Sequence, residues 1–130
     1  MRISRIISSL AFCLYIAAVA YLCFASPDHI PELPQLWFGL PSDKVGHFLM
    51  FLPYPILAYQ TFASKDMSPS RCSLILLIIM ITGVGTAFGT EQLQAALAYR
   101  SAEIHDLYAD TAGMLTGGLC VTGHILLKNR

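Results

Sequence analysis

Two groups of polar residues interrupt an otherwise apolar sequence, and their side chains are of kinds that do chemistry. Residues 91–113 contain four acids, one arginine and one histidine, although apolar runs lie on both sides of this stretch. Lys44 and His47 open another apolar run. Carboxylates and cations together can bind a phosphate or sugar headgroup, and a histidine among carboxylates can support hydrolysis with a divalent ion. The candidate ligand-binding residues are Lys44, His47, Glu91, Gln94, Arg100, Asp106 and Asp110, of which His47, Glu91, Asp106 and Asp110 are also the candidates for catalysis.

Four apolar segments must position these side chains. The chain has 130 residues, of which 55% are hydrophobic and only 12% are charged, about half the charged fraction of a soluble domain. Each segment is near the roughly 20 residues that a helix needs to cross a bilayer. We therefore predict an all-α integral membrane protein, a four-helix bundle formed by one domain over residues 1–130. The predicted spans are residues 6–25, 45–63, 72–92 and 107–127, and residues 26–44 form an outer loop.

The basic residues indicate how these helices are oriented. With the N-terminus inside, six of the eight basic residues fall on the inner side, namely Arg2, Arg5, Lys65, Arg71, Lys128 and Arg130. Lys44 and Arg100 face out, and seven of the eight acids lie at the outer side. This bias follows the positive-inside rule, so both termini are predicted to be cytoplasmic and the polar residues to lie at the outer face. The first segment is longer than a signal-peptide core of about 7–15 residues, so we expect an uncleaved anchor rather than a cleaved leader.

Small and polar residues share single faces on the third and fourth segments. On each segment, small residues lie at depth and carboxylates lie near the outer end, all at helical spacing. The two faces consist of Gly83, Ala87, Glu91 and Gln94 and of Asp106, Asp110, Gly113 and Gly117. Because small residues let helices approach closely, we expect these faces to pack together with their carboxylates directed inward, whereas Glu103 is expected to be solvated. With one further GxxxG pair, the predicted helix-packing residues are Gly83, Gly85, Gly89, Gly113 and Gly117.

The remaining features shape the loops and exclude several functions. Four prolines in the outer loop prevent a regular helix there, Ser42 and Asp43 are expected to cap the second span, and Pro53 and Pro55 should kink it. The four cysteines are isolated and the sequence contains no HExxH, so we predict neither a metal site nor a cofactor. The formal net charge is zero, so no nucleic-acid partner is predicted.

The polar motifs at the ends of the spans resemble those of the VanZ-like family, which is named for a glycopeptide (teicoplanin) resistance protein. A DKxxHFxxF element opens the second segment, an ExxQ element ends the third, and an arginine followed by DxxxNxxG opens the fourth. The matching residues are Asp43, Lys44, His47, Phe48, Phe51, Glu91, Gln94, Arg100, Asp106, Asp110 and Gly113. At the position that is usually asparagine in the family, this chain has Asp110, and an ionised carboxylate has no amide proton to donate.

The resemblance implies a multi-pass protein of the bacterial inner membrane that acts at the cell envelope, with a role of the antibiotic-resistance type. Its partners would be membrane lipids and a lipid-linked envelope precursor, and a homo-dimer through a GxxxG face is a further expectation. The first functional hypothesis is that the outward-facing polar residues bind the precursor's headgroup. Lys44 and Arg100 would then contact phosphate, while Glu91, Gln94 and Asp106 would hydrogen-bond its sugar or peptide portion.

Two other functional hypotheses remain open at the level of the sequence. One is a membrane-embedded hydrolase, with or without a metal ion, that uses the histidine and the carboxylates of the same cluster. The other is a small structural or carrier protein, in which the charged residues form an ion-pair network or a proton path. The inner half of the predicted bundle has few polar residues, which weighs against a path through a single chain.

Overall fold

Five α-helices and a short β-hairpin make up the part of the chain that the structure describes. The structure is a computed structural model and describes residues 2–29, 32, 34–98 and 103–130. The helices are α1 (Arg2–Phe24), α2 (Ser42–Phe51), α3 (Pro53–Phe62), α4 (Pro69–Ala95) and α5 (Ile104–Lys128). A 3₁₀ turn, η1 (Pro27–His29), and two strands, β1 (Leu36–Trp37) and β2 (Leu40–Pro41), lie between α1 and α2. The predicted all-α class is confirmed.

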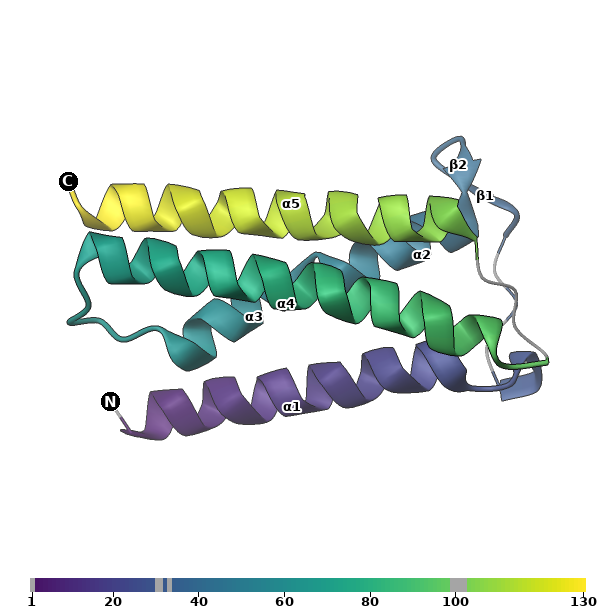
Figure 1. Cartoon of the computed structure of the whole chain (residues 1–130), viewed down its shortest axis with the longest axis horizontal. Helices are drawn as coiled ribbons and strands as arrows, with labels where there is room; N and C mark the ends of the chain where they lie inside the picture. Colours follow the sequence, from purple (N-terminus) through teal and green to yellow (C-terminus); the bar gives the residue numbers. More distant parts are fainter. Residues whose placement is uncertain (1, 30–31, 33, 99–102) are drawn as a thin grey trace.

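The helices run side by side along the long axis of the molecule, as Figure 1 shows. Helix α5 packs against α2, α3 and α4, and α3 also packs against α1 and α4. Both termini lie at one end and the hairpin lies at the other, which agrees with the prediction that the termini share one side (Figure 1). The buried core consists of Phe51, Tyr54, Ala58, Tyr59, Cys72, Ile79, Ala87, Met114, Val121 and Ile125.

The second predicted span is divided into two helices. The helix α2 ends at Phe51 and α3 begins at Pro53, and each of them has 10 residues. Pro53 and Pro55 have no backbone N–H, so the carbonyls of Leu49 and Phe51 lose the donors that a continuous helix would supply. The predicted kink is therefore confirmed, and it is strong enough to separate two helices.

Two glycines of α5 bring its backbone against this break. A Cβ atom at Gly113 would lie 2.2 Å from the carbonyl oxygen of Phe48, and one at Gly117 would lie 2.2 Å from the carbonyl oxygen of Leu52. Real side chains do not tolerate such distances, so only glycine permits this approach of the helices. The small face of α5 therefore packs mainly against α2 and α3, whereas the sequence predicted that it packs against α4.

The glycines of α4 divide into one that packs and two that do not. A Cβ atom at Gly83 would lie 2.3 Å from the sulfur of Met114, so this position is filled by a neighbouring helix. At Gly85 and Gly89 a Cβ atom would meet nothing within 4 Å. The prediction that Gly85 and Gly89 pack is wrong within the described part of one chain, because both lie on the outward face of α4. The predicted homo-dimer through such a face stays a prediction.

The predicted outer loop, residues 26–44, contains a hairpin that was not predicted from the sequence. Leu36 pairs with Pro41 and Trp37 pairs with Leu40, in antiparallel register. The two residues of the turn, Phe38 and Gly39, have φ values of 53° and 77°, which is the backbone of a tight two-residue hairpin loop. The helix α2 begins at Ser42 with Pro41 in the N-cap position and no side-chain capping bond, so the predicted cap by Ser42 and Asp43 is wrong.

The outer surface of the helices is apolar over much of its length. Large hydrophobic side chains face outward on every long helix, among them Leu14 at 72% exposed, Ile81 at 63% and Leu119 at 72%. Two helices, α1 and α4, are long and apolar enough to cross a membrane by length and composition. The helices α2 and α3 are each too short to cross one alone, and α5 is diluted by four glycines and by charged residues at both ends.

Candidate functional site

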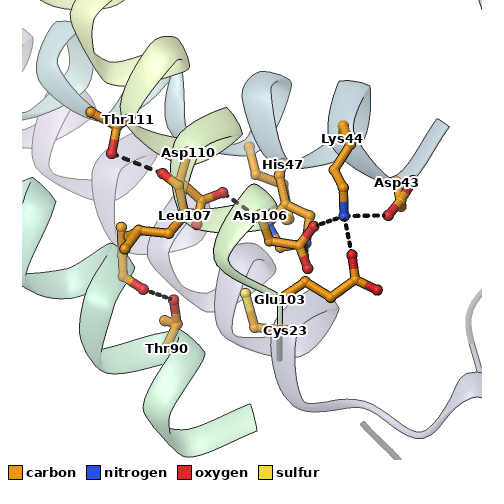
Figure 2. Close-up of polar contacts among 12 residues, drawn as sticks. Cys23, Asp43, Lys44, His47, Thr90, Glu103, Asp106, Leu107, Asp110 and Thr111 are labelled. Carbon is orange, nitrogen blue, oxygen red and sulfur yellow. Dashed lines mark hydrogen bonds and ion pairs between the residues drawn. The ribbon is translucent and has the colours of Figure 1, made fainter. Parts of the chain in front are cut away.

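The polar residues from three helices meet at the end of the molecule that carries the hairpin. Lys44 and His47 lie about one turn apart on α2, and Asp106 and Asp110 lie one turn apart on α5. These two pairs face each other in Figure 2, because the close approach at Gly113 holds α5 against α2. Glu91 enters from the end of α4. We call these five residues, with Asp43 and Glu103, the polar cluster.

Lys44 is the cation of an ion-pair network. Its Nζ atom lies 2.8 Å from Asp43 and 2.8 Å from Glu103, and it also contacts Asp106 (Figure 2). The hydrogen bond from Lys44 lowers the pKa of the Asp43 carboxyl. Burial opposes the charge on Lys44 itself, but the hydrogen bonds to Asp106, Asp43 and Glu103 outweigh it, so the pKa of Lys44 is raised. All three ammonium protons have carboxylate partners, which leaves none for the phosphate contact predicted from the sequence.

His47 lies between two aspartates of α5. Its Nδ1 atom is 2.8 Å from Oδ1 of Asp110, and its Nε2 atom is 3.6 Å from Oδ2 of Asp106. The first distance is a good hydrogen bond, whereas the second is too long for one. Asp110 is fully buried, at 0% exposed. It therefore fixes the orientation of the imidazole ring by accepting the Nδ1 proton, and it leaves Nε2 directed at Asp106.

Glu91 is buried without a partner. Its residue is 5% exposed, and neither of its carboxylate oxygens has a hydrogen-bond partner among the described residues. Oδ2 of Asp110 is likewise buried without a partner there. A buried charged group that lacks compensation costs several kcal/mol, on the order of 2 or more, and such groups in native proteins call for an explanation. The polar cluster thus holds acceptor atoms that the chain's own described residues do not satisfy.

Two other predicted site residues, Gln94 and Arg100, are not part of the polar cluster as the structure describes it. The Nε2 atom of Gln94 donates a hydrogen bond of 2.9 Å to the carbonyl oxygen of Cys23, so this buried amide joins α4 to the end of α1. This hydrogen bond gives Gln94 a role in packing, and its role in binding a headgroup stays a prediction. Arg100 lies outside the described residues.

The polar cluster contains two groups of side chains that could hold a metal ion. His47, Glu91 and Asp106 each offer a ligand atom within 4.8 Å of the others, and this group is largely buried. Asp43, Glu103 and Asp106 form the second group, which is more exposed. The ammonium of Lys44 already contacts all three members of the second group, so a cation is in place there.

Sequence reasoning missed the part that Glu103 plays. This acid was expected to be solvated, and it is about half exposed, but it also pairs with Lys44. The two residues are 59 positions apart, and no pattern in the sequence links them. Asp43 was also missed as a site residue. Its place in the DKxxHFxxF element, directly before Lys44, is the sequence feature that could have indicated it.

Removal of the Lys44 ammonium should destabilise the fold. In a Lys44→Met variant, the nearly buried carboxylate of Asp106 loses its strongest partner, and we expect a loss of about 2 kcal/mol, reduced from the cost of a fully buried pair because Lys44 is 22% exposed. Thermal unfolding in detergent measures this loss. The matched control is Glu103→Gln, which removes an exposed partner and should cost under about 0.5 kcal/mol. Equal melting temperatures for the two variants would contradict the assignment.

Comparison with known proteins identifies the family of the chain. A family model described as VanZ/LLP1 matches residues 12–127. An uncharacterized protein of the yeast Schizosaccharomyces pombe, C11E3.10, is 35% identical over 95 residues, which cover 72% of this chain and 49% of that protein. This chain therefore spans about half the length of the curated relative that it matches. No solved structure matches it. The chain belongs to the VanZ/LLP1 family.

Proposed function

We propose that this chain is a multi-pass membrane protein that binds the headgroup of a lipid-linked molecule at the polar cluster. In a bacterial inner membrane that molecule would be a cell-envelope precursor, and the role would be of the glycopeptide-resistance type. The outward-facing apolar side chains of the helices support the membrane setting, because in water they would form large exposed apolar patches. In lipid the same surfaces carry no such cost.

The observation that carries this proposal is the unpartnered carboxylate of Glu91. Its two oxygens are acceptors, so a ligand that satisfies them must bring hydrogen-bond donors or positive charge. The polar cluster already holds more carboxylates than cations among its described residues. A headgroup rich in hydroxyl or ammonium groups, such as a sugar or peptide portion, therefore fits the cluster better than a bare phosphate.

An apolar groove beside the cluster supports a lipid as the carrier of that headgroup. The groove has a volume of about 630 Å³ and runs between α4 and α5, lined by residues that include Phe88, Leu107 and Thr111. Leu107 and Thr111 directly follow Asp106 and Asp110 in the sequence, so the groove reaches the level of the cluster. A second cavity of about 720 Å³ lies near the opposite end, among residues such as Gln60 and His124. The lining of the first groove does not include Glu91, Asp106 or Asp110, so the groove would hold the lipid chain beside the cluster and not the headgroup itself.

Native mass spectrometry of the purified protein tests headgroup binding. The protein in gentle detergent is mixed with a polyprenyl-diphosphate-linked disaccharide, a polyprenyl phosphate and phosphatidylglycerol. We expect the wild type to retain the disaccharide-bearing lipid and Glu91→Gln to lose at least about 10-fold of this retention, because the neutral amide accepts fewer hydrogen bonds. The control Asp66→Asn, at an exposed acid in the turn between α3 and α4 and outside the cluster, should retain it. Equal retention of all three lipids by wild type and Glu91→Gln would overturn the proposal.

A second candidate is hydrolysis of a phosphate ester, and the grouping of His47, Glu91 and Asp106 favours it. Histidine and carboxylate ligands can position a metal-bound water as a nucleophile. The same lipids, incubated with the protein and followed by phosphate release, separate this candidate from binding alone. Retention of an intact lipid without turnover supports binding.

A further inference from the structure

We propose that His47, Glu91 and Asp106 bind one divalent transition-metal ion, Zn²⁺ or Mn²⁺, and that Asp110 is the positioning residue for His47. The binding of the ion stands on its own, whereas its part in headgroup recognition rests on the function proposed above. From the sequence we predicted no metal site and left a metal ion open only within the hydrolase hypothesis, because the three ligands come from three helices and do not form a spacing motif.

The distance between His47 and Asp106 is close to that between two ligands of one ion. Nε2 of His47 and Oδ2 of Asp106 are 3.6 Å apart, which is too long for a hydrogen bond. Two ligand atoms at about 2.1 Å from one tetrahedral ion lie about 3.4 Å from each other. A carboxylate oxygen of Glu91 lies within 4.8 Å of a ring nitrogen of His47 and of a carboxylate oxygen of Asp106, so a movement of the Glu91 side chain would bring it to the same ion.

Asp110 prepares the imidazole of His47 to act as a ligand. Its Oδ1 atom lies 2.8 Å from Nδ1 of His47 and holds the proton on that nitrogen. The lone pair is then on Nε2, the atom directed toward Asp106. A carboxylate that orients a metal-binding histidine in this way is a common feature of metal sites, and it makes the histidine a stronger ligand.

The buried and unpartnered carboxylate of Glu91 is the independent observation that points to an ion. An alternative arrangement has a doubly protonated His47 paired with Asp106 and Asp110. That arrangement satisfies both aspartates in part, but it leaves both oxygens of Glu91 without a partner among the described residues. A divalent cation compensates the charges of Glu91 and Asp106 together, and it thereby removes the free-energy cost of burying the uncompensated carboxylate of Glu91.

The types of ligand select the class of ion. One imidazole with two carboxylates suits Zn²⁺ or Mn²⁺, whereas Mg²⁺ and Ca²⁺ prefer oxygen ligands alone. Three protein ligands leave at least one coordination position open, as in metal sites that bind a water or a substrate. An oxygen of the bound headgroup would take that position.

Isothermal titration calorimetry of the chelator-treated protein in detergent, with ZnCl₂ and separately MnCl₂, tests the site in the absence of any lipid. We expect one ion per chain in the wild type. Binding should be about 100-fold weaker in Glu91→Gln and in Asp106→Asn, and about 10-fold weaker in Asp110→Ala, which loses only the orientation of the ring. Glu103→Gln, which alters the second group at the rim, should bind as the wild type does. Circular dichroism and gel filtration of each variant establish that it is folded.

Each outcome of this titration has a defined meaning. Binding that is equally strong in wild type and Glu91→Gln, or absent from both, overturns the metal site. Binding that is lost in Glu103→Gln but kept in Glu91→Gln moves the ion to the rim and also overturns it. A bound ion in a protein that retains no lipid would leave the metal site standing and refute the proposed function, and retention of lipid without an ion would do the reverse.

Discussion

Replacement of Gly113 by alanine is expected to lower the melting temperature of the protein by about 10 °C, because a single methyl group would force α5 away from α2. The new Cβ atom would lie 2.2 Å from the carbonyl oxygen of Phe48 and 3.1 Å from the backbone nitrogen of Leu52. Backbone atoms cannot turn aside as a flexible side chain can, so the helices must separate. Overpacking of this kind costs about 3 kcal/mol, which corresponds to about 10 °C for a domain of this size.

The same helix supplies a matched control for this prediction. At Gly123 a Cβ atom would meet nothing within 4 Å, so Gly123→Ala should leave the melting temperature unchanged or raise it slightly through higher helix propensity. Gly117→Ala should behave like Gly113→Ala, because its Cβ atom would lie 2.2 Å from the carbonyl oxygen of Leu52. Thermal unfolding of the three variants in one detergent gives the comparison. A similar melting temperature for Gly113→Ala and Gly123→Ala would show that the close packing of α5 on α2 is wrong.

This packing also connects the fold to the site. Gly113 lies one turn after Asp110 on α5, and Phe48 directly follows His47 on α2. A separation of the helices at Gly113 would therefore lengthen the hydrogen bond between His47 and Asp110, which is 2.8 Å in the intact protein. The glycines of α5 thus act on the polar cluster without contributing a side chain to it.

The helices and one face of α5 could be predicted from the sequence, because apolar length and helical spacing are local properties. The partner of that face could not. Gly113 and Gly117 share a face with Asp106 and Asp110 at helical spacing, yet spacing alone does not determine which helix packs against that face. In the structure these two glycines approach the carbonyl oxygens of Phe48 and Leu52 and the ring of Pro55, so α5 packs across the junction between α2 and α3.

The same limit explains why the two glycine pairs of the sequence differ in the structure. Gly85 and Gly89 have the GxxxG spacing as fully as Gly113 and Gly117 do, but they lie on the outward face of α4. Gly83, two residues before Gly85, is the one that meets Met114 and Tyr54. A GxxxG motif shows that one helix face carries small residues, and only the packing of the other helices determines whether that face is buried.

Most residues of the polar cluster could be predicted from the sequence, but the contacts between their side chains could not. The placement of His47, Glu91 and Asp106 at helix ends was visible in the sequence, as was their convergence at one end of the molecule. The triple pairing of Lys44 depends on a residue 59 positions away, and the absence of a partner for Glu91 depends on the exact side-chain positions of three helices. Such facts belong to tertiary structure and have no local signature.

Replacement of Glu91 by glutamine should stabilise the protein when no metal ion is present. Glu91 is 5% exposed and its carboxylate has no partner among the described residues, and a carboxylate oxygen of Asp106 lies within 4.8 Å of it. Glutamine keeps the shape, removes the buried charge and adds two protons that can be donated to those carboxylates. We expect a gain of about 2 kcal/mol, the cost of an uncompensated buried polar group.

The opposite sign follows if Glu91 has a structural role. A carboxylate that held the fold together through an ion pair would be missed, and glutamine would then destabilise the protein. If Glu91 lowers the stability of the fold, we infer that it is retained for binding, because proteins keep destabilising residues mainly at functional sites. The sign of one stability change therefore separates a binding site from an ion-pair network.

The most direct measurement is the melting temperature of the wild type and of Glu91→Gln, taken side by side in detergent at pH 8 with a metal chelator and again with added Zn²⁺ or Mn²⁺. We expect Glu91→Gln to melt several degrees above the wild type in the chelator, and the added ion to raise the wild type alone, since an ion that binds only the folded state stabilises it. If Glu91→Gln instead melts below the wild type in the chelator and neither protein responds to the ion, Glu91 is a structural residue and the polar cluster is not a binding site.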